Sequence, residues 1–121
     1  MTRSEAYKQR FTELENIEEQ FQDFRRVTAQ AQNAAVAGAR LLLLLLSYDQ
    51  TAPPCRIARH GDQVQIEWEN QHVLNRIYVD SYTSGVQIET YTPTDGTPIK
   101  TVKRLMSWSE NGIVYSEELS V

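Results

Sequence analysis

The first fifty residues carry the apolar pattern of a helix. Apolar side chains recur from Tyr7 to Leu45 at positions a and d of one heptad frame. Thr2 and Glu5 have the spacing of an N-terminal capping box. Because residues 1–50 contain no proline, the pattern predicts one long helix over about residues 3–48.

The length of this helix raises a question of assembly. A straight helix of this length would extend roughly 69 Å at about 1.5 Å per residue, whereas a compact chain of this size is about 35 Å across. The helix must therefore fold back as a hairpin, turning at a weak site such as Gln32-Asn33 or Gly38, or project and pack on a second chain. The lack of a proline or glycine turn between Ser4 and Ala37 favours the projecting helix. The residues expected at the resulting homodimer or higher-oligomer interface are Leu14, Ile17, Phe21, Phe24, Ala31, Ala35, Leu42 and Leu45.

Six consecutive leucines, Leu41–Leu46, cover every face of the predicted helix. A helix that is apolar all round is expected to be buried all round, by the sheet on one side and by another helix on the other. The longest apolar stretch, Ala34–Leu46, is shorter than the roughly 20 residues of a membrane span. A membrane association is therefore not expected.

The pattern changes to alternation after Ala52-Pro53-Pro54. Val64, Ile66 and Trp68 alternate with Gln65, Glu67 and Glu69, which predicts a strand with the first set facing the helix and the second facing solvent. Further strands are expected over residues 56–59, 73–79, 86–92 and 113–115. The turns expected between these elements are His60-Gly61-Asp62, Asn70-Gln71, Ser84-Gly85, Thr94-Asp95-Gly96 and Asn111-Gly112.

A short helix is expected near residues 98–108. Thr97-Pro98 has the chemistry of a helix start, and Ile99, Val102, Leu105 and Met106 follow at helical spacing. The predicted fold is therefore α+β: a long N-terminal helix on an antiparallel meander of about four to five strands, with this short helix near the end. We expect a single domain over residues 1–121, with 1–50 as a candidate coiled-coil dimerisation element and 53–121 as the sheet portion.

Composition excludes several classes of function. The chain of 121 residues has a net charge of −4 and a pI of about 5.1, so nucleic-acid binding is not expected, despite a basic side formed by Lys100, Lys103 and Arg104 on the predicted short helix. One cysteine excludes an intrachain disulfide and the multi-cysteine zinc patterns. Residues 1–10 lack the apolar region of a signal peptide, which favours a cytoplasmic location.

The candidate chemistry is sparse. Cys55 lies beside Arg56 and five residues before His60, which would suit an activated thiol. His60 and His72 sit by predicted turns, where Asp62 or Glu69 could help them to bind a metal. Glu67 and Glu69 project from one face of a strand, about 7 Å apart, near the separation of paired glycosidase carboxylates.

Each of these features also has a plain structural explanation, because turn histidines and outward-facing carboxylates are usually solvated. We therefore expect a non-catalytic protein-interaction or regulatory protein, of the inhibitor, antitoxin, immunity, chaperone or adaptor type. It would act as a homo-oligomer on an unidentified protein partner, with no catalytic residue, cofactor or metal. The alternative is a small enzyme or metal-binding protein with a site around Cys55, His60, Glu67 and Glu69.

Overall fold

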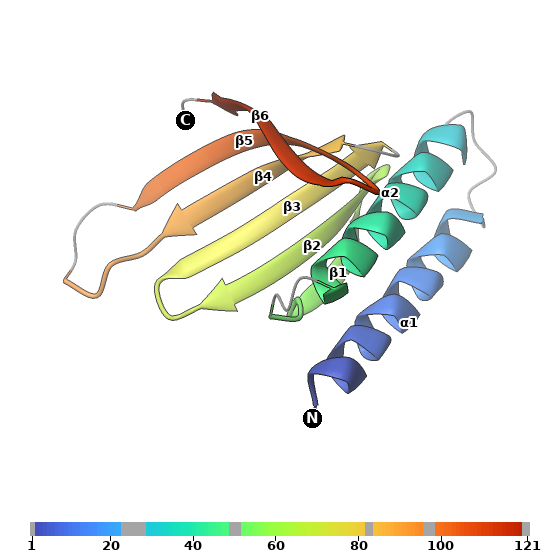
Figure 1. The fold of residues 1–121 in the computed structure, drawn as a ribbon, viewed down its shortest axis with the longest axis horizontal. Helices are drawn as coiled ribbons and strands as arrows, with labels where there is room; N and C mark the ends of the chain where they lie inside the picture. The colour runs from blue at the N-terminus through green and yellow to red at the C-terminus, as the bar shows by residue number, and fades with distance from the viewer. Residues whose placement is uncertain (1, 23–28, 49–51, 82–83, 96–98, 120–121) are drawn as a thin grey trace.

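Two antiparallel helices lie on one side of a six-stranded antiparallel meander (Figure 1). The computed structural model describes residues 2–22, 29–48, 52–81, 84–95 and 99–119. The α+β class and the antiparallel sheet are confirmed, with six strands where four to five were predicted. The elements are α1 (Arg3–Gln22), α2 (Ala29–Tyr48), β1 (Arg56–His60), β2 (Gln63–Asn70), β3 (Val73–Ser81), β4 (Ser84–Tyr91), β5 (Lys100–Ser109) and β6 (Gly112–Leu119).

The prediction of one continuous helix is wrong, because α1 ends at Gln22 and α2 begins at Ala29. The two helices run antiparallel and pack on one another, which is the hairpin alternative. The expected turn sites are also wrong, since Gln32-Asn33 and Gly38 lie inside α2. Each helix of 20 residues is about 30 Å long, which matches the size of the domain.

Polar contacts fix the pairing of the two helices. The backbone amide of Glu5 donates to Thr2 Oγ1 at 3.2 Å, so one half of the predicted capping box is present. Arg3 donates to the carbonyl oxygens of Leu46 and Ser47, at 3.3 and 2.8 Å, at the end of α2. A cation at this end also opposes the partial negative charge of the helix C-terminus. The start of α1 therefore caps the end of α2.

The strands pair in chain order, so the inner and outer faces of the sheet follow from the register. Val64 pairs with Val79 and Ile66 with Ile77, and all four side chains are buried toward the helices. Trp68 lies on the same inner face, partly buried against the core. The predicted inner set of β2 is therefore confirmed. On the outer face Glu69 is exposed, whereas Gln65 and Glu67 are half-buried.

The predicted helix at residues 98–108 is wrong, because β5 occupies Lys100–Ser109. β5 pairs with both β4 and β6, so its backbone groups have partners on two sides. The spacing that suggested a helix also fits a strand in which Val102, Met106 and Trp108 share the inner face. Lys100 and Arg104 lie on that face and Lys103 on the other, so the expected basic side is divided.

Two of the predicted turns illustrate when turn chemistry is informative. Gly61 lies in the turn between β1 and β2 with φ of 59°, a conformation that favours glycine. Ser84-Gly85, by contrast, belongs to β4 rather than to a turn. A Cβ on Gly85 would lie 2.7 Å from the carbonyl oxygen of Tyr78 and 3.1 Å from the ring of Trp108. Glycine is therefore required here for close packing.

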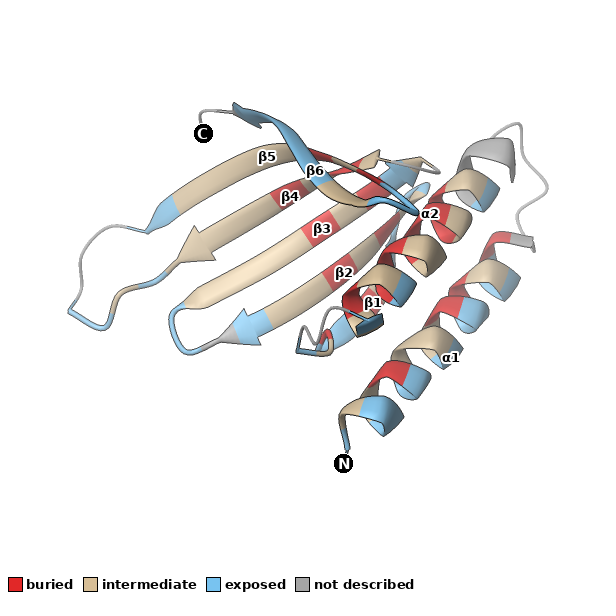
Figure 2. Cartoon of the chain, viewed as in Figure 1, coloured by how far each residue is buried: buried red, intermediate tan, exposed pale blue. Residues whose placement is uncertain are grey.

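The core lies between α2 and strands β1–β3 and extends to α1 and β5 (Figure 2). Leu42 and Leu43 are fully buried within the leucine tract, with α1 on one side and the sheet on the other. Leu44 remains 39% exposed, so the tract is not buried all round as expected. The helices and the sheet thus share one core, and it is formed within a single chain.

Candidate functional site

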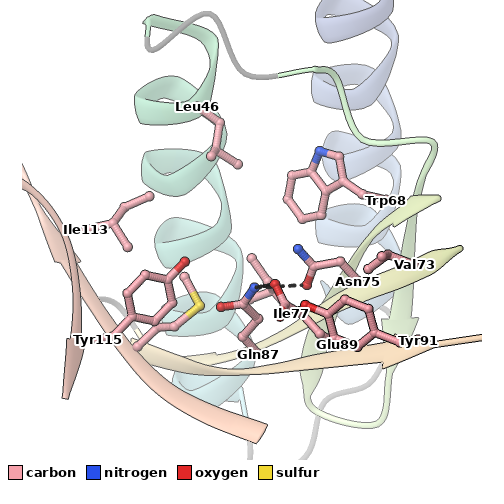
Figure 3. Close-up of a pocket in the computed structure, with 11 residues that line it drawn as sticks. Leu46, Trp68, Val73, Asn75, Ile77, Gln87, Glu89, Tyr91, Ile113 and Tyr115 are labelled. Atoms are coloured by element: carbon pink, nitrogen blue, oxygen red, sulfur yellow. Dashed lines mark hydrogen bonds between the residues drawn. The ribbon is translucent and has the colours of Figure 1, made fainter. Parts of the chain in front are cut away.

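An open-mouthed cavity of about 550 Å³ lies between the end of α2 and the inner face of β2–β6. Leu46, Trp68 and Ile113 form apolar walls, and Asn75 and Gln87 lie among polar groups on the sheet (Figure 3). This size and this mixture of apolar walls with a few polar groups are typical of small-molecule sites. The remaining lining residues are Val73, Ile77, Glu89, Tyr91, Met106 and Tyr115.

A chain of hydrogen-bonded side chains crosses the floor of the cavity. Gln87 Nε2 donates to Asn75 Oδ1 and to Glu89 Oε1, both at 3.1 Å. Gln87 is only 3% exposed, and its Oε1 is buried without a hydrogen-bond partner among the described residues. A buried carbonyl with no donor costs about 1–3 kcal/mol. Because this oxygen has almost no accessible surface, it is an unsatisfied acceptor of the fold and not a group open to the cavity.

Glu89 determines which way both amides point. A carboxylate oxygen only accepts, so the Gln87 amide must present its nitrogen to Glu89 and its oxygen to the other side. Asn75 then presents its oxygen to Gln87 and its nitrogen elsewhere. In Figure 3 the Gln87 oxygen points toward the Tyr115 side of the cavity and the Asn75 nitrogen toward Trp68.

Two further donors complete the surroundings of Glu89. Tyr91 Oη donates to Glu89 Oε2 at 2.8 Å, and Arg104 Nη1 donates to the same oxygen at 3.4 Å. The hydrogen bond to Glu89 raises the pKa of Tyr91 above its ordinary value, so this phenol holds its proton at neutral pH. Arg104 also lies 5.5 Å from the centre of the Tyr115 ring. The cluster therefore pairs its negative charge with a positive one.

The candidate thiol lies outside the cavity. Cys55 is exposed just before β1, and its Sγ donates to the carbonyl oxygen of Glu67 at 3.2 Å. Partial burial, followed by the charge of Glu67, raises the pKa of this thiol. A raised pKa is the reverse of what activates a nucleophile. Glu67 itself is paired with Arg76 at 2.9 Å on the outer face of the sheet.

The two histidines lie far apart. His60 ends β1 and is exposed, with its ring 4.7 Å from that of Tyr78. His72 is exposed in the turn between β2 and β3. These turns are at opposite ends of β2, roughly 25 Å apart at about 3.3 Å per residue. The structure therefore does not bring the two histidines together, and no group of three metal-ligating side chains occurs within the described ranges.

The residues predicted for an oligomer interface lie mostly inside the chain. Leu14, Ile17, Phe21, Ala35 and Leu42 are buried in the core. Leu45 packs against that core and is partly buried. Phe24 and the side chain of Ala31 lie outside the described residues. The homodimer stays a prediction, but the helix length that suggested it is accounted for by the hairpin.

Sequence reasoning missed the cavity residues because β4 reverses the usual pattern. In this strand Val86 and Ile88 face outward, while Gln87 and Glu89 face the helices, because Gln87 pairs with Ile77. Polar residues at alternate strand positions are normally read as the solvent face. The neighbouring Gly85 was a usable signal, because a glycine inside a strand often marks close packing.

Two wider observations bear on the site. Among the residues that the structure describes, none of the helices combines the length and the apolar character needed to cross a membrane. No protein-family model, no curated protein and no solved structure matches the chain, so the site is interpreted from its own geometry.

Proposed function

We propose that the protein is a non-catalytic regulatory protein that binds a small amphipathic molecule in the cavity between α2 and the inner face of the sheet. The observation that carries this proposal is the open cavity of about 550 Å³, with apolar walls and hydrogen-bonded polar side chains on its floor. The apolar body of a bound molecule would cover Trp68 and Leu46, and its polar part would lie against the floor.

The lining supports binding rather than chemistry. The candidates for a catalytic base or nucleophile, His60, His72 and Cys55, do not line the cavity. Tyr91 and Glu89 are tied to one another, with Arg104 beside them. The class expected from the sequence is a protein-interaction or regulatory protein that acts on a protein partner, and a bound small molecule would supply the signal for that action.

Binding can be tested with N-phenyl-1-naphthylamine, a neutral probe whose fluorescence rises in apolar surroundings. We expect saturable binding to the full chain. Val73→Phe would place a ring in the cavity and weaken this binding, because Val73 lines it. Val86→Phe is the matched control, because Val86 is a half-buried valine on the outer face of β4.

Circular dichroism must first show that both variants are folded, so that a change in binding is not caused by unfolding. Weaker binding in Val73→Phe with unchanged binding in Val86→Phe supports the proposal. The absence of saturable binding in the unaltered chain, or an equal effect of the two variants, contradicts it.

A further inference from the structure

A separate open groove of about 450 Å³ lies between α1 and β1, the first strand of the sheet. We infer that this groove binds an acidic, extended peptide of a partner protein, which joins the sheet as a further strand beside β1. The inference does not depend on the proposed small-molecule site, because the groove and the cavity share no lining residue.

The lining residues show that the groove follows the edge of the strand. Four consecutive residues of β1 line it, from Arg56 to Arg59. Because successive side chains of a strand point to opposite faces, a space that touches all four runs along the edge of the strand. The α1 residues that line the groove lie on one side of that helix, at spacings of three and four: Glu13, Asn16, Ile17 and Gln20.

The layer of helices extends past the edge of the sheet. A helix with its side chains is about 10 Å across and neighbouring strands are about 4.8 Å apart, so one helix covers about two strands. α2 packs on β2 and β3, whereas α1 packs on β1 and lies beyond that edge of the sheet (Figure 1). Among the described strands β1 pairs with β2 alone. The groove therefore lies where one more strand would fit, and an extended peptide can pair with the backbone of such an edge.

The charge of the groove favours an acidic peptide. Two of the four β1 residues that line it are arginines, although the whole chain has a net charge of −4. Arg56 is exposed, and the carboxylate opposite it, Glu67, is bound to Arg76 at 2.9 Å. On the helix side, Glu13 is paired with Arg10 at 3.1 Å. An acidic side chain of a peptide would gain a cation here, whereas a basic one would meet carboxylates that already have theirs.

The faces of β1 define the order of side chains in the peptide. Ile57 is buried toward the helices, so the peptide residue opposite it would lie against Ile17 and should be apolar. Arg56 faces outward, and Arg59 faces inward over the ring of Phe21 at 5.8 Å. Opposite charges across two strands stabilise their pairing. For an antiparallel peptide the expected order is therefore acidic, any residue, apolar, acidic.

Binding is tested with a fluorescein-labelled hexapeptide of this pattern, Ser-Glu-Thr-Val-Glu-Thr, titrated with the full chain and followed by fluorescence anisotropy. We expect saturable binding. The same peptide with lysine in place of both glutamates should bind at least about tenfold more weakly. The absence of saturable binding, or equal affinity of the two peptides, overturns the inference.

Methylation of the peptide backbone distinguishes strand pairing from simple attraction between charges. In an antiparallel pair, alternate residues direct their N–H groups toward the neighbouring strand and the others direct them away. Two further peptides carry N-methyl groups on one or the other of these alternate sets. We expect one set to abolish binding and the other to leave it within about threefold. An equal effect of the two sets overturns the inference.

A charge reversal places the peptide on β1. Arg56→Glu should weaken binding at least about tenfold, and a peptide with lysine in place of its second glutamate should recover affinity for this variant. Lys100→Glu is the matched control, because Lys100 is an exposed cation of β5 that does not line the groove, and it should change affinity less than about twofold. Circular dichroism checks that both variants are folded. An equal loss in the two variants, or no recovery with the lysine peptide, overturns the inference.

Discussion

The indole nitrogen of Trp108 donates a buried hydrogen bond of 3.0 Å to the carbonyl oxygen of Gly38, 70 residues earlier in the chain. Glycine lies on both sides of this ring, because Gly38 is buried in α2 and Gly85 is in contact with the ring from β4. The absence of a side chain at Gly85 thus leaves room for the ring, which joins the second helix to the far half of the sheet.

Trp108 should therefore be a major determinant of stability. Trp108→Phe keeps a ring and loses the donor, so we expect the free energy of unfolding to fall by about 1–2 kcal/mol. Trp108→Ala also leaves a cavity and should cost about 3–5 kcal/mol. Denaturant unfolding measures both. Trp68→Phe is the control, with a cost below about 1 kcal/mol, because its hydrogen bond to Ala52 is exposed.

Gly85→Ala should destabilise the protein through a steric clash and not through backbone strain, because Gly85 does not have a positive φ angle. The new Cβ would lie 2.7 Å from the backbone oxygen of Tyr78, which cannot move as a side chain can. We expect a cost of about 1–3 kcal/mol in denaturant unfolding. Gly61→Asn is the control, because a side chain at this position would meet no other atom and asparagine tolerates a positive φ angle. It should lower the free energy of unfolding by less than about 1 kcal/mol. A neutral Gly85→Ala would show that β4 and Trp108 are not packed as described.

The helical hairpin can be tested at its buried seam. Leu42→Ala should lower the free energy of unfolding by about 2–5 kcal/mol, because Leu42 is fully buried within one chain. Leu44→Ala should cost less than about 1 kcal/mol, because Leu44 is 39% exposed. The unfolding midpoint should not change with protein concentration. A midpoint that rises with concentration would instead favour the homodimer predicted from the sequence.

Cys55 should react more slowly with a disulfide reagent at neutral pH than a free thiol does. Its pKa is raised by partial burial and then by the charge of Glu67, so the thiolate forms only at higher pH. The reaction rate should therefore rise with pH to a midpoint above the ordinary thiol value. Glu67→Gln removes the second cause, and the midpoint should fall. A midpoint below the ordinary value would restore the activated-thiol hypothesis.

Periodicity along the sequence determined the fold class. The heptad pattern placed helix over most of residues 3–48, because a helical stripe depends only on local spacing. The alternation of Val64, Ile66 and Trp68 likewise placed the inner face of β2 correctly. These signals survive because each element buries the face that its own pattern defines.

Contacts between distant residues decided the rest. No proline in the sequence marks the division between α1 and α2. The antiparallel pair of helices is stabilised by contacts such as Arg3 with Ser47 and Glu18 with Arg40. β5 became a strand because β4 and β6 pair with it on both sides. Strand pairing of this kind supplies backbone hydrogen bonds that no local pattern encodes.

The cavity was decided by register in particular. Gln87 faces inward because β4 pairs with β3 so that Gln87 lies opposite Ile77, and Gly85 leaves room for Trp108. A shift of one residue would have turned Val86 and Ile88 inward and left Gln87 and Glu89 in solvent. Apolar patterning favours that alternative locally. Only the tertiary structure, through the register of β4 on β3, places the polar floor of the site beneath the helices.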